Sequence, residues 1–184
     1  MFNFIVEAKS RQDLRMIAYS LRAQLKLENR LFFPVVEMLD VFSEIFSPQF
    51  SYEIVEDSEL AINTHANTNV LFDRIRTGHI QIKQSVYDGA CEGNGRDRMT
   101  IAHELGHFIT LCLLKFKLDK NFSKEEYPSY RDPEWQAKCF AGELLVPAHL
   151  VCDLTPKQIA SKCGVSIDAA KIQYDHIHKG GGDN

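Results

Sequence analysis

The sequence predicts an α+β fold that is mainly helical, with a small antiparallel β-sheet beside one buried helix. Apolar residues recur at helical spacing in several segments, and two short strand-like segments precede the most apolar of these helices. The chain has 184 residues, of which 45% are hydrophobic and 25% charged, so it can bury the core of one compact domain. Its net charge of −4 provides no general attraction to nucleic acid.

Two amphipathic helices are expected before the sheet. The first covers residues 10–27, where Ser10 and Asp13 resemble a capping box and an apolar stripe follows at helical spacing. The second opens at Pro34, a residue favoured in a first helical turn, and runs to about Phe46.

The sheet is expected to contain a strand at residues 52–55 and a hairpin of residues 70–72 and 79–83, joined by a turn at 76–78. Alternation in the last strand turns Ile80 and Ile82 inward and His79, Gln81 and Lys83 outward. An edge strand of such a sheet can align an extended peptide through main-chain hydrogen bonds. We expect the polar stretch that contains His65, and residues 85–95, to be loops.

The segment from Thr100 to Thr110 contains His103-Glu104-Leu105-Gly106-His107, an H-E-x-x-H pattern inside an apolar helix. Residues i and i+4 lie on one face of a helix, so both imidazoles can bind one metal ion, and imidazole nitrogen suits zinc. Glu104 projects from a neighbouring position and can take a proton from an attacking water without being a ligand. The alternative is a pair of buried histidines that are satisfied by hydrogen bonds.

A catalytic zinc ion needs three protein ligands and one open position. Asp132 and Pro133 open a further helix that ends near Leu145. Glu134 projects beside the buried stripe of this helix and is the preferred third ligand, with Glu143 as its rival. Spacing alone separates the two only modestly. Cys112 and Cys139 are weaker alternatives, because neither has the usual spacing to a partner ligand.

Two motifs resemble those of the ImmA/IrrE family of zinc metallopeptidases. One reads Arg-Met-Thr-Ile-Ala-His-Glu-Leu-Gly-His-Phe at residues 98–108, and the other reads Glu-x-x-Ala-x-x-Phe-Ala-x-Glu-Leu-Leu-Val-Pro at residues 134–147. The resemblance covers residues 86–147 and implies Glu134 as the third zinc ligand and Glu104 as the general base. The family usually has Asn after the Ala of the second motif, where this chain has Lys138.

The resemblance implies a zincin-like, zinc-dependent endopeptidase that cleaves a helix-turn-helix transcriptional repressor and so derepresses its genes, often in a prophage or mobile element. Two functions of other classes stay open. One is a catalytically silent binding module of the same fold that sequesters a repressor, and the other is a DNA-binding regulator. The oxyanion donor that an endopeptidase needs is sought among Tyr127, Tyr130 and His149.

Five widely spaced cysteines, with no C-x-x-C pair, are interpreted as reduced thiols in a cytoplasmic protein. Charged residues follow the first six positions at once, so no targeting segment is expected there, and no apolar run approaches the length of a membrane span. We expect no membrane partner.

The C-terminal part is predicted to be a helical hairpin over residues 154–179, after a metallopeptidase domain at residues 1–153. Thr155 and Pro156 start its first helix, Gly164 makes the turn and Ser166 caps the second helix, which is helix-turn-helix punctuation. The second helix offers one base, Lys171, so a docking hairpin is favoured over a DNA-binding one. Residues 180–184 are expected to be a disordered tail.

Overall fold

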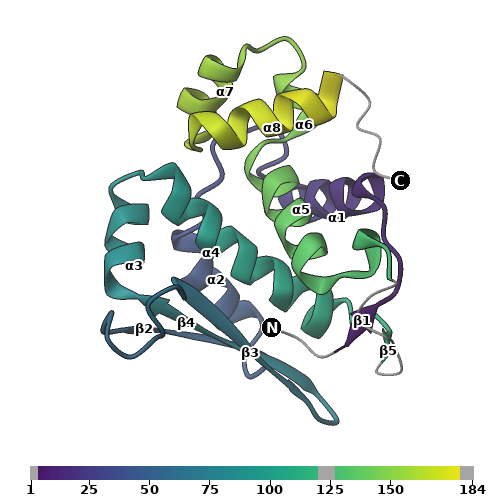
Figure 1. The fold of residues 1–184 in the computed structure, drawn as a ribbon, viewed down its shortest axis with the longest axis vertical. Helices are drawn as coiled ribbons and strands as arrows, with labels where there is room; N and C mark the ends of the chain where they lie inside the picture. The colour runs from purple at the N-terminus through teal and green to yellow at the C-terminus, as the bar shows by residue number, and fades with distance from the viewer. Residues whose placement is uncertain (1–3, 120–126, 179–184) are drawn as a thin grey trace. The chain divides into compact units, whose positions relative to one another are not determined.

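A computed structural model describes residues 4–119 and 127–178 (Figure 1). The chain divides into two compact units, Pro34–Lys115 and the pair of segments Met1–Phe33 and Phe116–Asn184. Each unit combines helices with short strands, so the expected α+β class is confirmed. Within the described ranges, no helix has the length and apolar character needed to cross a bilayer.

The Pro34–Lys115 unit contains a three-stranded sheet and the helices that pack on it. Its elements are α2 (Glu37–Ile45), β2 (Phe50–Val55), β3 (Ala66–Phe72), β4 (Arg76–Lys83), α3 (Gln84–Cys91), α4 (Gly95–His107) and the π-helix η1 (Phe108–Leu113). The strand order is β2-β4-β3, with β4 parallel to β2 and antiparallel to β3. The expectation of an antiparallel sheet is therefore wrong for β2. The chain crosses from β2 to the far edge before the β3–β4 hairpin brings it back, so β2 and β4 run in the same direction.

The hairpin turn lies earlier than expected. Residues 76–78 belong to β4, and Phe72 pairs with Arg76 across the hairpin. Position 78 of the strand is a glycine because η1 approaches it closely. A Cβ at this position would lie 2.9 Å from Cδ2 of Phe108 and 3.3 Å from Sγ of Cys112. A glycine inside a strand often marks such a close approach rather than a turn.

The expected alternation of β4 is confirmed for Ile80 and Ile82, which are fully buried. It is wrong for Lys83, which is also buried, and whose Nζ donates a hydrogen bond to the carbonyl oxygen of Ala61 at 3.0 Å. The strand ends at Lys83 and α3 follows at once, so the alternation stops there. The aliphatic part of the side chain is covered while the ammonium group reaches a backbone acceptor.

Of residues 85–95, expected to be a loop, residues 85–91 belong to α3 and Gly95 begins α4, so only residues 92–94 are non-helical. Val86 and Ala90, four residues apart, are the buried face of α3. Gly89 lies against α4, where a Cβ would collide with the carboxylate of Asp97. The glycines suggested a loop, but this one serves the close packing of two helices.

An aromatic cluster joins α2, β2 and η1. The ring centroids of Phe42 and Phe50 are 6.0 Å apart, those of Phe50 and Phe108 are 4.7 Å apart, and those of Phe46 and Phe108 are 5.7 Å apart. Aromatic pairs at such separations add to the stabilisation that burial alone provides. The cluster therefore anchors the segment that directly follows the His103–His107 pair.

The second helix of the chain, α2, begins at Glu37, after the expected start at Pro34.

The other unit is largely helical, and Figure 1 shows α1 and α5 side by side in it. Its elements are β1 (Ile5–Val6), α1 (Arg11–Gln24), β5 (Leu118–Asp119), the 3-10 helix η2 (Ser129–Arg131), α5 (Pro133–Leu145), α6 (Ala148–Val151), α7 (Pro156–Cys163) and α8 (Ile167–His178). Strands β1 and β5 pair antiparallel. The capping box of α1 is confirmed, with Oγ of Ser10 accepting from the backbone N–H of Asp13 at 3.2 Å.

A buried arginine links the C-terminal ends of α1 and α5. The side chain of Arg22 is fully buried and donates hydrogen bonds to the carbonyl oxygens of Leu144, at 2.6 Å, and of Arg30. Its guanidinium group also lies over the ring of Phe33, 5.3 Å from the centroid. Burial lowers the pKa of Arg22 to about 10. The carbonyl acceptors satisfy donors that would otherwise be costly to bury.

The two C-terminal helices begin and end at the capping and turn residues that the sequence predicts. Thr155 caps α7 in a capping box, and Gly164 ends that helix with a φ of 66°, in the left-handed region. Helix α8 packs on α5 within the same unit, where a Cβ on Gly142 would collide with the side-chain amide of the buried Gln173. Lys171, the one lysine or arginine of α8, lies 3.5 Å from the carboxylate of Asp168 on the same helix. The expected tail at residues 180–184 lies outside the described residues.

Candidate metal centre

The helix that carries the H-E-x-x-H pattern is well defined at its start. The side chain of Asn94 accepts hydrogen bonds from the backbone N–H groups of Arg96, at 2.9 Å, and Asp97, at 3.4 Å. Asp97 also places a negative charge in the first turn, where the helix dipole favours it. Ile101 and Leu105 are fully buried and fix the rotation of α4 about its axis. The predicted helix is therefore confirmed.

His103 and His107 are brought together as their spacing predicts. Their Nε2 atoms lie 3.1 Å apart, and the two rings are nearly perpendicular, at 87°, with centroids separated by 4.7 Å. Two nitrogens bound tetrahedrally to one zinc ion at about 2.0–2.1 Å are themselves about 3.3–3.4 Å apart. The observed pair therefore fits two zinc ligands with only a small adjustment. The same distance also fits one N–H···N hydrogen bond, which is the alternative expected from the sequence.

Glu104 is held by a residue of the neighbouring strand. Its side chain is 7% exposed, and its Oε2 accepts a hydrogen bond of 2.6 Å from Oγ1 of Thr68, which lies on β3 and is 5% exposed. A hydroxyl that donates to a carboxylate at this distance makes a strong, charge-assisted bond. Among the described residues, no hydrogen bond to Oε1 is present, so one carboxylate oxygen is committed and the other is available.

Thr68 is the site residue that sequence reasoning missed, because it lies in the stretch interpreted as a polar loop. The sequence does contain a pattern that indicates a strand at this position. Ala66, Thr68 and Val70 alternate with two asparagines, as expected for a strand with one small or β-branched face and one polar face. The predicted strand covered only residues 70–72, whereas β3 begins at Ala66.

The helix changes character directly after His107. The π-helix η1 begins at Phe108, and the N–H of Leu114 bonds to the carbonyl of Ile109, five residues back, at 2.9 Å. Oγ1 of Thr110 donates to the carbonyl of Gly106 at 2.8 Å and so helps to satisfy the altered backbone. Such π segments often accompany functional sites.

The two glutamates considered as third ligand differ in their partners within their own unit. Glu134 lies half-buried in the first turn of α5, where its backbone N–H donates to the N-capping side chain of Asp132 at 2.9 Å. Glu143 is 2% exposed and receives hydrogen bonds from Nε and Nη2 of Arg15, at 2.8 and 3.2 Å. Arg11 adds a third contact at 3.4 Å. The bonds to Glu143 raise the pKa of Arg15. Glu143 is thus already neutralised by arginines.

The other candidate side chains have different surroundings. Burial raises the pKa of Cys112 to about 12, so its thiol stays protonated and is a poor metal ligand. Nε2 of His149 bonds to the carbonyl of Glu28 at 2.8 Å, and its ring meets that of Tyr19 edge to face. This histidine therefore serves the packing around α6. His65 is exposed, as expected.

Comparison of the chain with known proteins does not identify a family. No family model matches the chain, and no curated protein matches it. The fold and the site together define an α+β protein with a paired-histidine, H-E-x-x-H helix beside a small sheet.

Proposed function

We propose that this chain is a zinc-dependent endopeptidase with a zincin-like fold. The observation that carries the proposal is the arrangement on α4. The Nε2 atoms of His103 and His107 converge to 3.1 Å, and the carboxylate of Glu104, between them in sequence, is fixed by Thr68. Two imidazoles and an adjacent, oriented carboxylate supply two of the three ligands and the general base that zinc-assisted peptide hydrolysis requires.

We assign Glu134 as the third ligand. His103, His107 and Glu134 can each offer one ligand atom, which completes the two-histidine, one-carboxylate set found in zinc hydrolases. The rival Glu143 is paired with Arg15 and Arg11, and its use as a metal ligand would take the counter-charge away from these two half-buried cations. The resemblance to the ImmA/IrrE motifs supports the same choice. Because Glu134 belongs to the other unit, this assignment is tested separately by metal content.

Glu104 is assigned the role of general base. When bound, zinc would supply a Lewis acid that polarises the scissile carbonyl and makes water more acidic. Oε1 of Glu104 takes the proton from the attacking water and passes it to the leaving amine. Thr68 keeps Oε2 occupied, so that the carboxylate presents one oxygen in one orientation. Thr68 is thus a positioning residue in this scheme.

The edge strand β3 suits the alignment of an extended peptide. It lies at the edge of the β2-β4-β3 sheet, and Thr68 connects it directly to Glu104. The N–H and C=O groups on the outer side of an edge strand can pair with an added strand. We propose that the substrate backbone pairs with β3 and so presents its scissile bond near Glu104.

The substrate that we propose is a helix-turn-helix transcriptional repressor, whose cleavage would derepress its genes. This part of the proposal rests on the resemblance of the two motifs to the ImmA/IrrE family. It requires an extended or locally unfolded segment in the repressor, because an edge strand binds its partner in an extended form.

The test is to incubate the zinc-loaded chain with a purified candidate repressor and to measure the intact masses of the products. Glu104→Gln is the matched control, since it keeps the size of the side chain and removes its basicity. We expect two fragments with the wild type and an intact, bound repressor with the variant. Binding without shortening by the wild type would support the sequestering module instead. Cleavage by Glu104→Gln would falsify the proposed role of Glu104.

A further inference from the structure

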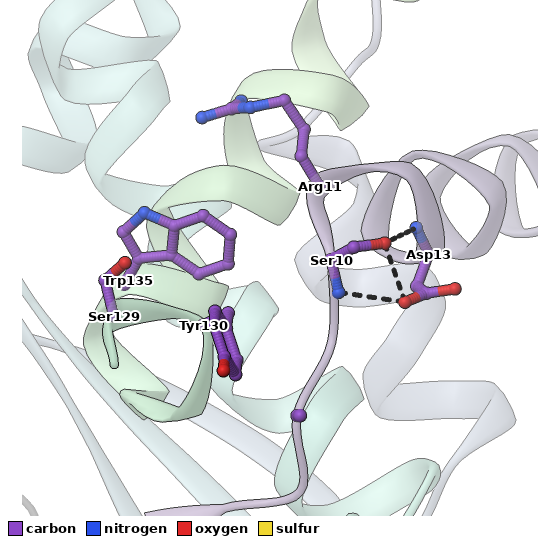
Figure 2. Close-up of a pocket in the computed structure, with 7 residues that line it drawn as sticks. Ser10, Arg11, Asp13, Ser129, Tyr130 and Trp135 are labelled. Carbon is purple, nitrogen blue, oxygen red and sulfur yellow. Dashed lines mark hydrogen bonds between the residues drawn. The ribbon is translucent and has the colours of Figure 1, made fainter. Parts of the chain in front are cut away.

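The unit that contains α1 and α5 has a cavity lined partly by aromatic side chains. The cavity has a volume of about 320 Å³, and it lies between the start of α1 and the segment from η2 to α5 (Figure 2). Ligand pockets span roughly 300–1,000 Å³, so this one suits a single side chain or a fragment of that size. Ala8, Ser10, Arg11, Tyr130 and Trp135 are among its lining residues.

Two aromatic side chains form one side of the cavity. Figure 2 shows Trp135 and Tyr130 facing the chain that runs through Ser10 to Arg11. The backbone of Tyr130 is anchored, because its carbonyl oxygen accepts from the backbone N–H of Lys9 at 3.2 Å and from the side-chain amide of the buried Gln136 at 2.8 Å. The spacing between the two sides is therefore held by the fold.

The two charged residues that line the cavity already have partners. The guanidinium group of Arg11 lies 6.0 Å from the ring centroid of Trp135 and can extend the stacking surface. The carboxylate of Asp13 is engaged in the capping box, where it accepts from both N and Oγ of Ser10 at 2.8 Å. These hydrogen bonds lower the pKa of Asp13. Arg11 is itself paired with Glu143 at 3.4 Å, and the carboxylate of Asp13 is committed to Ser10, so neither charged group is free to attract a lysine or arginine side chain.

We propose that this cavity binds an uncharged aromatic side chain of the peptide substrate, of the phenylalanine type. Trp135 directly follows Glu134, so the cavity and the assigned third ligand both draw on the first turn of α5. The identification of the occupant as a substrate residue rests on the proposed endopeptidase function. The preference for an aromatic ring rests on the cavity alone.

The chain offers a direct probe, because Trp135 is its one tryptophan. The metal-free full chain is titrated with N-acetyl-phenylalaninamide while indole emission is excited at the red edge, where a phenyl ring does not absorb. We expect a saturable change with a Kd on the order of 1 mM, which is typical for a ligand of this size. N-acetyl-leucinamide and N-acetyl-lysinamide are the aliphatic and cationic comparisons, and we expect both to bind at least about 10-fold more weakly.

Two variants at one position complete the test. Ala8→Leu narrows the cavity and is expected to weaken binding about 10-fold or more, whereas Ala8→Ser adds one oxygen atom and is expected to bind as the wild type does. Equal responses to the phenyl and leucyl amides, or an unchanged Kd in Ala8→Leu, would overturn the inference. A failure to bind zinc would remove the endopeptidase proposal but leave the aromatic titration supporting the cavity. Zinc binding without a fluorescence response would overturn the inference alone.

Discussion

Two buried glutamates on two helices show how differently the same side chain can be used. Glu104 on α4 meets a neutral hydroxyl, that of Thr68, at 2.6 Å. Glu143 on α5 meets two arginines, with the contact to Nε of Arg15 at 2.8 Å. Burial alone does not separate them, since the two residues are 7% and 2% exposed. The partners do.

A buried carboxylate whose charge is balanced by arginines contributes to the stability of the fold, and breaking the pair lowers the free energy of unfolding. A carboxylate held by one neutral donor keeps an uncompensated charge and a second oxygen, which costs stability unless a function uses them. From this comparison, we infer that Glu143 stabilises the fold through its ion pairs and that Glu104 acts as a general base. The predictions below test this assignment, from the largest expected effect to the smallest.

The largest effect is expected from Glu104→Gln. Loss of the general base should lower kcat by about 10²–10⁴-fold. The free energy of unfolding should change by less than about 1 kcal/mol, because the amide still accepts the hydrogen bond of Thr68. Cleavage assays and urea unfolding of the same preparation measure both quantities. A large loss of stability with full activity would reverse the assignment.

The same substitution at the other glutamate should give the opposite pattern. Glu143→Gln leaves the half-buried Arg15 and Arg11 without their counter-charge, which should lower the free energy of unfolding by about 2 kcal/mol. Zinc content per folded chain should stay at the wild-type value. Chemical unfolding and metal analysis decide the outcome, and loss of zinc with unchanged stability would instead make Glu143 the ligand.

A smaller effect is expected at Thr68. Thr68→Val keeps the shape and removes the hydroxyl, so kcat should fall by about 10–100-fold with KM and zinc content unchanged. Thr68→Ser restores a donor and is the control, with activity close to the wild type. An effect of Thr68→Val on KM alone would show that β3 acts in substrate binding and not through Glu104.

The smallest effect concerns the thiols, where burial of Cys112 outweighs the opposite influence of the nearby Arg76 on its pKa. Burial raises the pKa of Cys112 to about 12, whereas Cys91 and Cys152 are exposed. Iodoacetamide at neutral pH should therefore modify the two exposed cysteines of the native chain and spare Cys112. Peptide mass mapping before and after unfolding checks this. Rapid labelling of Cys112 in the native state would contradict the packing of η1 against Gly78.

Local signals made several elements predictable. The capping box of Ser10 and Asp13, the Asp132-Pro133 start of α5 and the glycine at position 164 are each confirmed as helix starts or ends. The pairing of His103 with His107 is likewise a property of four-residue spacing on one helix. These features depend on neighbours in sequence.

The features that sequence reasoning missed depend on contacts between distant segments. Gly78 was interpreted as part of a turn because its close approach to Phe108, thirty positions away in the numbering, is invisible in the sequence. Lys83 was expected to face solvent, and its acceptor is the backbone of Ala61. Thr68 becomes a site residue only when β3 is paired in register with β4 and laid against α4.

Metal content tests the central claim most directly. The chain and four variants, His107→Ala, Glu134→Ala, Glu104→Gln and Glu143→Gln, are loaded with zinc, dialysed and analysed by mass spectrometry. We predict about one zinc ion per chain in the wild type and in both Gln variants, with loss in His107→Ala and Glu134→Ala. Zinc that persists without Glu134 would remove it from the ligand set, and a wild type that holds no zinc would contradict the account as a whole.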